Sequence, residues 1–180
     1  LGFQIETIGF SEKADVKLRA HQDTSDIQSV EIIKDGLIHR FKTLLIGKFQ
    51  AINLGMALLT CETFGFKFTE IVNYCDILKP VPGRLEFVGK TKSGASIYID
   101  FAHTPDALKH LLQTLRAFTK SDLILVFGAG GERDKDKRKP MGEIAHKYCD
   151  LIYVTDDNPR NENAAGIRKQ IIKGCPGAIE

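Results

Sequence analysis

Three short groups of polar and charged residues hold the side chains with which this chain could do chemistry. Each follows a short apolar stretch, and the groups are Asp100 with His103, residues 128–138, and Asp157, Asn158, Pro159 and Arg160. Carboxylates accept hydrogen bonds, the arginine fork binds carboxylate or phosphate, and histidine can exchange protons near neutral pH. These residue types suit the recognition of a small charged molecule.

The third group has the mixture that an amino acid zwitterion needs. A carboxylate (Asp157) can pair with an ammonium group, and a guanidinium (Arg160) can pair with a carboxylate. Pro159 stiffens the loop, so that less conformational entropy is lost on binding. The alternative is purely structural, because Asp-Asn-Pro sequences often form an Asx-turn and cap a helix.

The second group begins with Gly128-Ala129-Gly130-Gly131 and continues through Glu132 and Arg133. Glycine backbone can approach a ligand closely, and Arg133 could then bind an acidic group. The string is not a phosphate-binding P-loop, because no Lys-Ser or Lys-Thr follows at the required spacing. The alternative is a tight turn between a strand and a helix, with an arginine on the surface.

The first group is less specific. His103 is a candidate general acid or base, although a histidine before a helix N-cap often bonds only locally. Asp100 ends an apolar strand, where an unpaired carboxylate is unfavourable, so a ligand hydroxyl is one candidate partner. The other histidines show no metal-ligand spacing, and the cysteines form no C-x-x-C pair. These residues are His21, His39, His110, His146, Cys61, Cys75, Cys149 and Cys175.

The first part of the chain predicts a hairpin and two helices. Residues 1–46 alternate apolar and polar around a turn at residues 34–36. A helix follows from Gly47, with Ile52, Met56, Leu59 and Thr63 on one face and Gly65 as its stop. Thr69 is expected to cap a second helix that ends at Leu78. Pro80 and Pro82 then mark a boundary between a domain at residues 1–82 and another at residues 83–180.

The second part predicts three strand and helix units. The strands are expected at Ile97–Phe101, Leu123–Phe127 and Leu151–Thr155. The helices are expected from the cap Thr104 through Phe118, at about 141–148, and at about 163–173 before Gly174. This alternation predicts an α/β fold with a parallel sheet covered on both faces. Because ligands of such sheets bind beyond the carboxyl ends of the strands, all three polar groups are expected along one edge.

Composition excludes some functions. The formal net charge is +2, from 25 basic and 23 acidic residues, and no aromatic residues interrupt a basic stripe, so nucleic acid binding is not indicated. No apolar run approaches the roughly 20 residues that a membrane-spanning helix needs. The scattered cysteines are expected to be reduced, and the protein cytoplasmic.

Several strings together resemble the Mur ligase family. They are residues 47–53, Pro82-Gly83-Arg84-Leu85-Glu86, residues 98–106, residues 127–141 and residues 155–160, and they occur in the family's order and approximate spacing. Gln50 departs, since the family commonly has Asn there. The resemblance implies the end of a central ATP-binding domain followed by a truncated Rossmann-like domain.

Within that family, the string Asp157-Asn158-Pro159-Arg160 marks ligases that add meso-diaminopimelate to UDP-N-acetylmuramoyl-alanyl-glutamate through an acyl phosphate, in peptidoglycan synthesis. The resemblance implies amino acid contacts from Arg133, Asp157, Asn158 and Arg160, with Pro159 shaping the loop. It implies nucleotide contacts from Asn53, Arg84, Asp100 and, less directly, His103. ATP and Mg²⁺ are the implied cofactors, with the metal ligands outside this chain, and no further catalytic residue is assigned.

Because the chain starts without Met and ends just after a helix signal, we expect it to be a fragment that is inactive alone, from a monomeric enzyme. Two alternatives stay open. One is a related ligase of the folate polyglutamate or cyanophycin type, which should lack the Arg133 and Asp157–Arg160 motifs. The other is a nucleotide-binding module without turnover.

Overall fold

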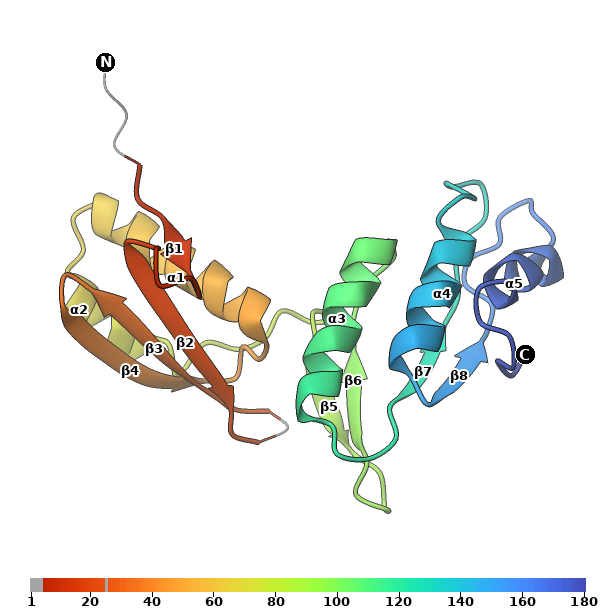
Figure 1. The fold of residues 1–180 in the computed structure, drawn as a ribbon, viewed down its shortest axis with the longest axis horizontal. Coiled ribbons are helices and arrows are strands. Elements are labelled where there is room, and N and C mark those ends of the chain that lie inside the picture. The colour runs from red at the N-terminus through yellow and green to blue at the C-terminus, as the bar shows by residue number, and fades with distance from the viewer. Residues whose placement is uncertain (1–4, 25) are drawn as a thin grey trace. The chain divides into compact units, whose positions relative to one another are not determined.

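The computed structural model describes residues 5–24 and 26–180. The chain divides into two compact units, Leu1–Asp100 and Phe101–Glu180 (Figure 1). Each unit has its own secondary structure and is described separately below.

The first unit contains a four-stranded sheet in the order β1-β2-β3-β4. Strand β1 (Ile8–Gly9) pairs in parallel with β2 (Val16–Gln22), whereas β2, β3 (Gln28–Lys34) and β4 (Leu37–Thr43) are antiparallel. Asp35 and Gly36 both have positive φ, 51° and 76°, as a two-residue turn matched to the strand twist requires. The predicted hairpin is therefore confirmed.

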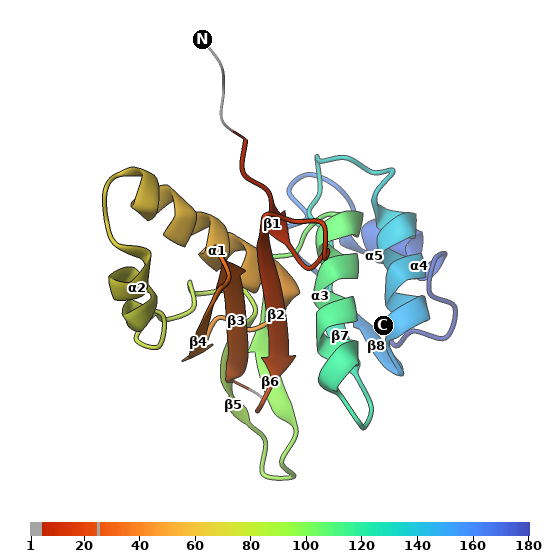
Figure 2. The ribbon, with the colours of Figure 1, turned by 60° about the vertical axis from the view of Figure 1, so that its left-hand side comes forward.

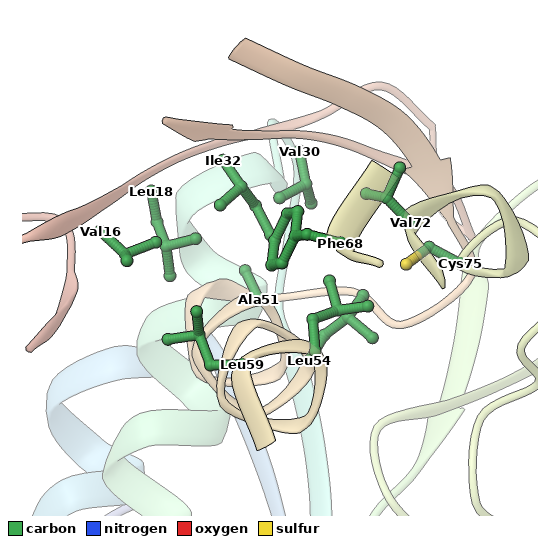
Figure 3. Packing of buried hydrophobic residues seen from close by; sticks show 11 residues of the cluster. Val16, Leu18, Val30, Ile32, Ala51, Leu54, Leu59, Phe68, Val72 and Cys75 are labelled. Carbon is green, nitrogen blue, oxygen red and sulfur yellow. The ribbon is translucent and has the colours of Figure 1, made fainter. Parts of the chain in front are cut away.

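Helix α1 (Lys48–Thr63) covers this sheet, but with a different face from the predicted one (Figure 3). Its buried positions recur at helical spacing, and they are Ala51, Leu54, Gly55, Leu58 and Leu59. Of the predicted stripe only Leu59 is buried, and Met56 is 52% exposed. The reason is close packing, since a Cβ on Gly55 would meet Ile8 Cδ1 at 2.4 Å. The helix therefore packs Ala51 and Gly55 together with its leucines in the core.

The segment after α1 also differs from the prediction. Gly65 does stop the helix, with φ 92° and its N–H donating to the carbonyl of Glu62. The second helix then starts at Phe68, which is buried in the core, and Thr69 does not cap it. Helix α2 (Phe68–Ile71) tightens into the 3₁₀ turn η1 (Val72–Tyr74). Ile77 and Leu78 are exposed, so no burial favours continuing the helix.

The strand expected at Ile97–Phe101 forms as β6 (Ser96–Ile99). It pairs antiparallel with β5 (Glu86–Lys90), a strand that the pattern did not predict. Both strands belong to the first unit, Leu1–Asp100.

The second unit holds two strand and helix units and the helix before them. Its elements are α3 (Pro105–Phe118), β7 (Ile124–Phe127), α4 (Arg138–Tyr148), β8 (Leu151–Val154) and α5 (Ala164–Ile172). Strands β7 and β8 are parallel, and Tyr153 forms a further parallel bridge with Ile179. The cap predicted at Thr104 is confirmed, since its side chain accepts from Ala107 N, and Asn163, near which the last helix was expected to begin, caps α5 by accepting from Gly166 N.

The helices cover one face of this parallel pair. Ile152 and Val154 are buried with residues of α4 and α5, and α3 lies beside α4 (Figures 1 and 2). On the alternate positions Ile124 is 55% and Val126 is 64% exposed. Coverage of both faces is therefore wrong for the described residues.

Two glycines allow α4 and the end of α5 to touch. An added Cβ on Gly142 would meet the carbonyl oxygen of Ile171 at 2.2 Å, and one on Gly174 would meet that of Lys139 at 2.1 Å. The contact of these helices holds α4, and with it the loop before α4, in place.

Replacing Gly142 with alanine is expected to lower the free energy of unfolding by about 1–3 kcal/mol, because the added methyl group overpacks this contact. Gly166→Ala is the matched control, since an added Cβ there has no neighbour nearer than 3.9 Å and alanine favours helix. Urea unfolding followed by circular dichroism measures both. Equal stability of the two variants would contradict the close packing of α4 on α5.

Candidate functional site

Two loops leave the carboxyl ends of β7 and β8 side by side. Phe127 and Val154 are paired at the end of the ladder, and Thr155 N donates to Phe127 O over 3.0 Å. The loop at residues 128–137 is called the glycine loop below, and the loop at residues 155–163 the arginine loop. As expected from the parallel pairing, the second and third polar groups lie at one edge.

The glycine loop needs its glycines for contact with the arginine loop. An added Cβ on Gly131 would lie 1.9 Å from the carbonyl oxygen of Pro159, and one on Gly128 would lie 2.5 Å from that of Thr155. Gly131 N also donates to Asn158 O over 2.8 Å. The glycines were predicted to approach a ligand, and the structure instead shows them approaching the neighbouring backbone.

The arginine loop is ordered by its own side chains. Asn158 Oδ1 accepts from Arg160 N at 3.1 Å, which is the Asx-turn of the structural alternative, and Asp157 Oδ1 accepts from Asn158 N at 2.7 Å. Arg160 has φ 49° and its Nη1 donates to Gly131 O at 2.6 Å. The turn thus aims Arg160 back at the glycine loop.

An ion pair between the buried Arg138 and the half-buried Glu162 joins the two loops. Arg138 at the start of α4 is 0% exposed, and its two terminal nitrogens donate to both carboxylate oxygens of Glu162 at 3.0 Å each. The same guanidinium donates to Gln170 Oε1 at 2.7 Å and to Gly130 O at 3.3 Å. Glu162 Oε1 also accepts from Glu132 N at 2.5 Å. One ion pair therefore contacts both loops and α5.

Sequence reasoning missed Arg138 and Glu162. The run from Glu132 to Lys139 mixes both charges, and its default interpretation is a solvated loop. Helical phase could have identified the exception, because Arg138 stands three, four and seven residues before Met141, Gly142 and Ala145, which are buried. An arginine on a buried face needs an acidic partner.

The residues predicted to bind an amino acid lie on the exposed side of these loops. Arg133, Asp157, Asn158 and Arg160 are exposed and Pro159 is half-buried. Arg133 forms no hydrogen bond or ion pair with the residues that the structure describes. Each arginine has five donors, and the only bond of the Arg160 guanidinium to a described residue uses one of them. These five residues of the two loops are called the rim below, and its two arginines still have donors with which to bind acidic groups.

A small hollow lies against the arginine loop. Its lining includes Asp157, Pro159, the residues after β8 and the start of α5. The hollow is open and shallow, so the loops of this unit do not by themselves enclose a ligand.

The predicted nucleotide residues belong to different units. Asn53 is exposed on α1. Arg84 is exposed beside Leu85, whose N–H donates to Asp100 Oδ2 at 2.7 Å, so the segments of Arg84 and Asp100 are joined. The half-buried Asp100 is therefore satisfied in part by backbone. An amide, a guanidinium and a carboxylate fit adenine, phosphate and ribose hydroxyls by the chemistry of their donors and acceptors.

His103 lies in the second unit and bonds locally, as in the structural alternative. Its Nδ1 is 3.1 Å from Phe101 O and its ring packs edge-on against Phe101. Its carbonyl accepts from Lys137 Nζ at 2.8 Å. The segment before α3 is thereby tied to the end of the glycine loop.

The four cysteines are all free thiols. Burial raises the pKa of Cys75 to about 11 and that of Cys149 to about 12, so both stay protonated near neutral pH. Within residues 5–24 and 26–180, no three His, Cys, Asp or Glu side chains gather as metal ligands would. In the same residues no helix combines the length and apolar character needed to cross a membrane.

The charge pair predicts a pH dependence. Hydrogen bonds from Arg138 first, then from the Glu132 amide, lower the pKa of Glu162 from 4.5 to about 2. A lowered folded pKa gives stability that is complete above the unfolded value and is lost as the pH falls toward the folded value. Between pH 4.5 and pH 2 the melting temperature should therefore fall more steeply for the wild type than for Glu162→Gln. A constant difference between the two proteins over that range would contradict the pairing.

Comparisons with known proteins agree with this geometry. Residues 83–180 match the family model described as Mur ligase, glutamate ligase domain. The chain is 39% identical over 179 residues to UDP-N-acetylmuramoyl-L-alanyl-D-glutamate–2,6-diaminopimelate ligase of Agrobacterium fabrum, covering 99% of this chain and 36% of that one. The chain thus spans about a third of the length of the curated relatives it matches.

Solved structures give the same fold. A structure of a ligase with that same name matches with a TM-score of 0.62 and 29% identity, over 95% of this chain and 35% of that chain. The ADP complex of Mycobacterium tuberculosis folylpolyglutamate synthase matches with a TM-score of 0.72 and 22% identity, over 93% and 38%. The family model covers more than half of the residues, and residues 83–180 include both loops described above. This chain therefore belongs to the Mur ligase family.

Proposed function

We propose that this chain is part of an ATP-dependent ligase that adds meso-diaminopimelate to UDP-N-acetylmuramoyl-L-alanyl-D-glutamate. The reaction forms an amide bond through an acyl phosphate and serves peptidoglycan synthesis. Support comes from the relatives of that name, which match 85% to 99% of the chain at 39% to 44% identity.

The observation that carries the proposal is the hydrogen-bonded pair of loops at the carboxyl ends of β7 and β8. Arg160 contacts Gly131, and Arg133 stands two residues further along the same loop. Two guanidinium groups on one rim suit an amino acid with two carboxylates, and Asp157 suits an ammonium group. Lysine has the same two ammonium groups but lacks the second carboxylate, so an arginine that pairs with that carboxylate would face lysine's terminal ammonium group and repel it.

The nucleotide side is proposed from residue chemistry. Asn53 would contact adenine, Arg84 phosphate and ribose, Asp100 the ribose hydroxyls, and His103 the phosphates. ATP would activate the carboxylate and Mg²⁺ would neutralise phosphate charge, with the metal ligands supplied outside this chain. The catalytic step would then depend mostly on positioning the amine against the acyl phosphate.

Three further proposals concern the protein as a whole. The ligase would act in the cytoplasm as a monomer, and the 180 residues alone would be inactive. The boundary between the ATP-binding and amino-acid-binding domains is proposed at residues 82/83.

Another ligase of the superfamily is the alternative, but the relatives do not favour it. The matching folylpolyglutamate synthase structure is 22% identical and shares the fold alone. A nucleotide-binding module without turnover is a third candidate. A ligase and a module differ in whether amino acid triggers phosphate release.

The decisive experiment is phosphate release by the full-length protein that contains this chain, with ATP, Mg²⁺ and the UDP-linked dipeptide. We expect release to depend on meso-diaminopimelate and to be far slower with lysine. Release with lysine or glutamate in preference would overturn the substrate assignment. No release with any amino acid would favour the binding module.

Changing Arg160 to alanine in that protein should remove a charge-assisted bond of about 1.5–3 kcal/mol. The expected result is a kcat/KM for diaminopimelate lowered about tenfold or more. The control is Lys169→Ala, which removes an exposed cation from α5 and should leave the kinetics unchanged. Unchanged kinetics in the Arg160 variant would remove the role proposed for it.

A further inference from the structure

We propose that Arg138 and Glu162 are positioning residues that set the spacing of the two arginines of the amino acid site. This inference rests on the proposed function and deepens it, because it concerns how the same rim tells a doubly acidic amino acid from others. Neither residue has its side chain on the exposed rim, so both would act through their neighbours.

Glu162 is close in sequence or by hydrogen bonding to the backbone beside both Arg133 and Arg160. Glu132, whose N–H donates to Glu162 Oε1, directly precedes Arg133. Glu162 itself stands two residues after Arg160. A single carboxylate therefore ties together the backbone next to each arginine, and the distance between two guanidinium groups depends on it.

Arg138 fixes that carboxylate. Its guanidinium donates to both oxygens of Glu162, and two further bonds attach it to the glycine loop at Gly130 and to α5 at Gln170. The fork leaves Glu162 little freedom to rotate, because two parallel bonds define both position and plane. Lys135 approaches Glu162 to only 3.4 Å and is mostly exposed, so it adds charge without this orientation.

Stability alone is a weak reason for such a pair. A buried ion pair is unfavourable to desolvate, and apolar residues of similar size often serve stability as well or better. The Nε of Arg138 is buried and has no hydrogen-bond partner among the described residues. What apolar residues could not replace is the directional link to two loops.

The test uses the full-length protein and three variants. Glu162→Gln leaves Arg138 charged and buried without a counter-charge, so both the melting temperature and the use of diaminopimelate should fall. In the double variant Arg138→Met with Glu162→Gln no buried charge is left unpaired, and the melting temperature should recover in large part. Arg138→Lys keeps the charge but loses the fork of the guanidinium group. Its use of diaminopimelate should therefore lie between that of the wild type and that of the double variant.

Positioning predicts that the kinetic defect persists when stability recovers. In the double variant we expect the KM for diaminopimelate to be raised about tenfold or more, equivalent to about 1.4 kcal/mol, with the KM for ATP unchanged. The ratio of kcat/KM for diaminopimelate over lysine should fall, because only the doubly acidic substrate needs both arginines. The matched control is Lys139→Met with Glu143→Gln, which removes an exposed ion pair from the same helix.

Two results would overturn the inference. One is a double variant whose KM for diaminopimelate returns to the wild-type value along with its melting temperature. The other is a failure of both Glu162 variants to fold, which would make the pair a stability element. Failure of the proposed function would look different, since the wild type would then not prefer diaminopimelate, and the effect of the pair would be measured on the amino acid that it does use.

Discussion

Backbone lies directly against backbone where the loops after β7 and β8 meet, and the organisation of the rim depends on that contact. Gly128 and Gly131 permit it, because any side chain at either position would overlap the carbonyls of Thr155 or Pro159. Backbone groups in such a contact must still be hydrogen-bonded, and Gly131 N to Asn158 O meets that requirement. Some side chains near this contact lie in solvent and others are shielded from it. Arg133 and Asp157 are exposed, whereas Glu162 pairs with Arg138, the buried first residue of α4.

Two residues of these loops have a strained backbone conformation. Glu132 and Arg160 have φ of 53° and 49°, in a region where a residue other than glycine is strained by about 1–3 kcal/mol. Each is held there by more than one bond. Glu132 is fixed by Glu162 and, through its side chain, by Asn161, while Arg160 is fixed by Asn158 and Gly131. Surrounding structure of this kind is what keeps a strained residue in place, and both strained residues adjoin or form the proposed amino acid site.

Local chemistry made part of this fold predictable. The Asp35-Gly36 turn and the cap at Thr104 depend on a few adjacent residues, and each was predicted correctly. The buried face of α1 was not, because the close approach of Ile8 to Gly55 selects the face that carries Gly55 and the leucines, and this contact is not visible in the helical pattern alone. The pairing of β6 with β5 was missed for a similar reason. An apolar strand does not specify its partner.

The candidate site was also predictable only in part. Its location followed from strand order, and its exposed residues were named from their types. The ion pair of Arg138 and Glu162 was not predicted, since Arg138 lies in a run of mixed charges and Glu162 is 24 residues away. Of the nucleotide residues, Asp100 has a backbone partner and His103 bonds locally. Their chemistry fits the proposed role, although it does not require it.

The bonds between the two loops connect positions 24 to 30 residues apart, such as Arg138 with Glu162 and Glu132 with Glu162. Closing a chain segment of that length is entropically unfavourable unless something else has already brought its ends together. The β7 and β8 ladder does so, since it pairs Phe127 with Val154 next to both loops. The rim should therefore assemble late in folding, after the ladder and α4, and should be lost with the unit as a whole rather than by local fraying.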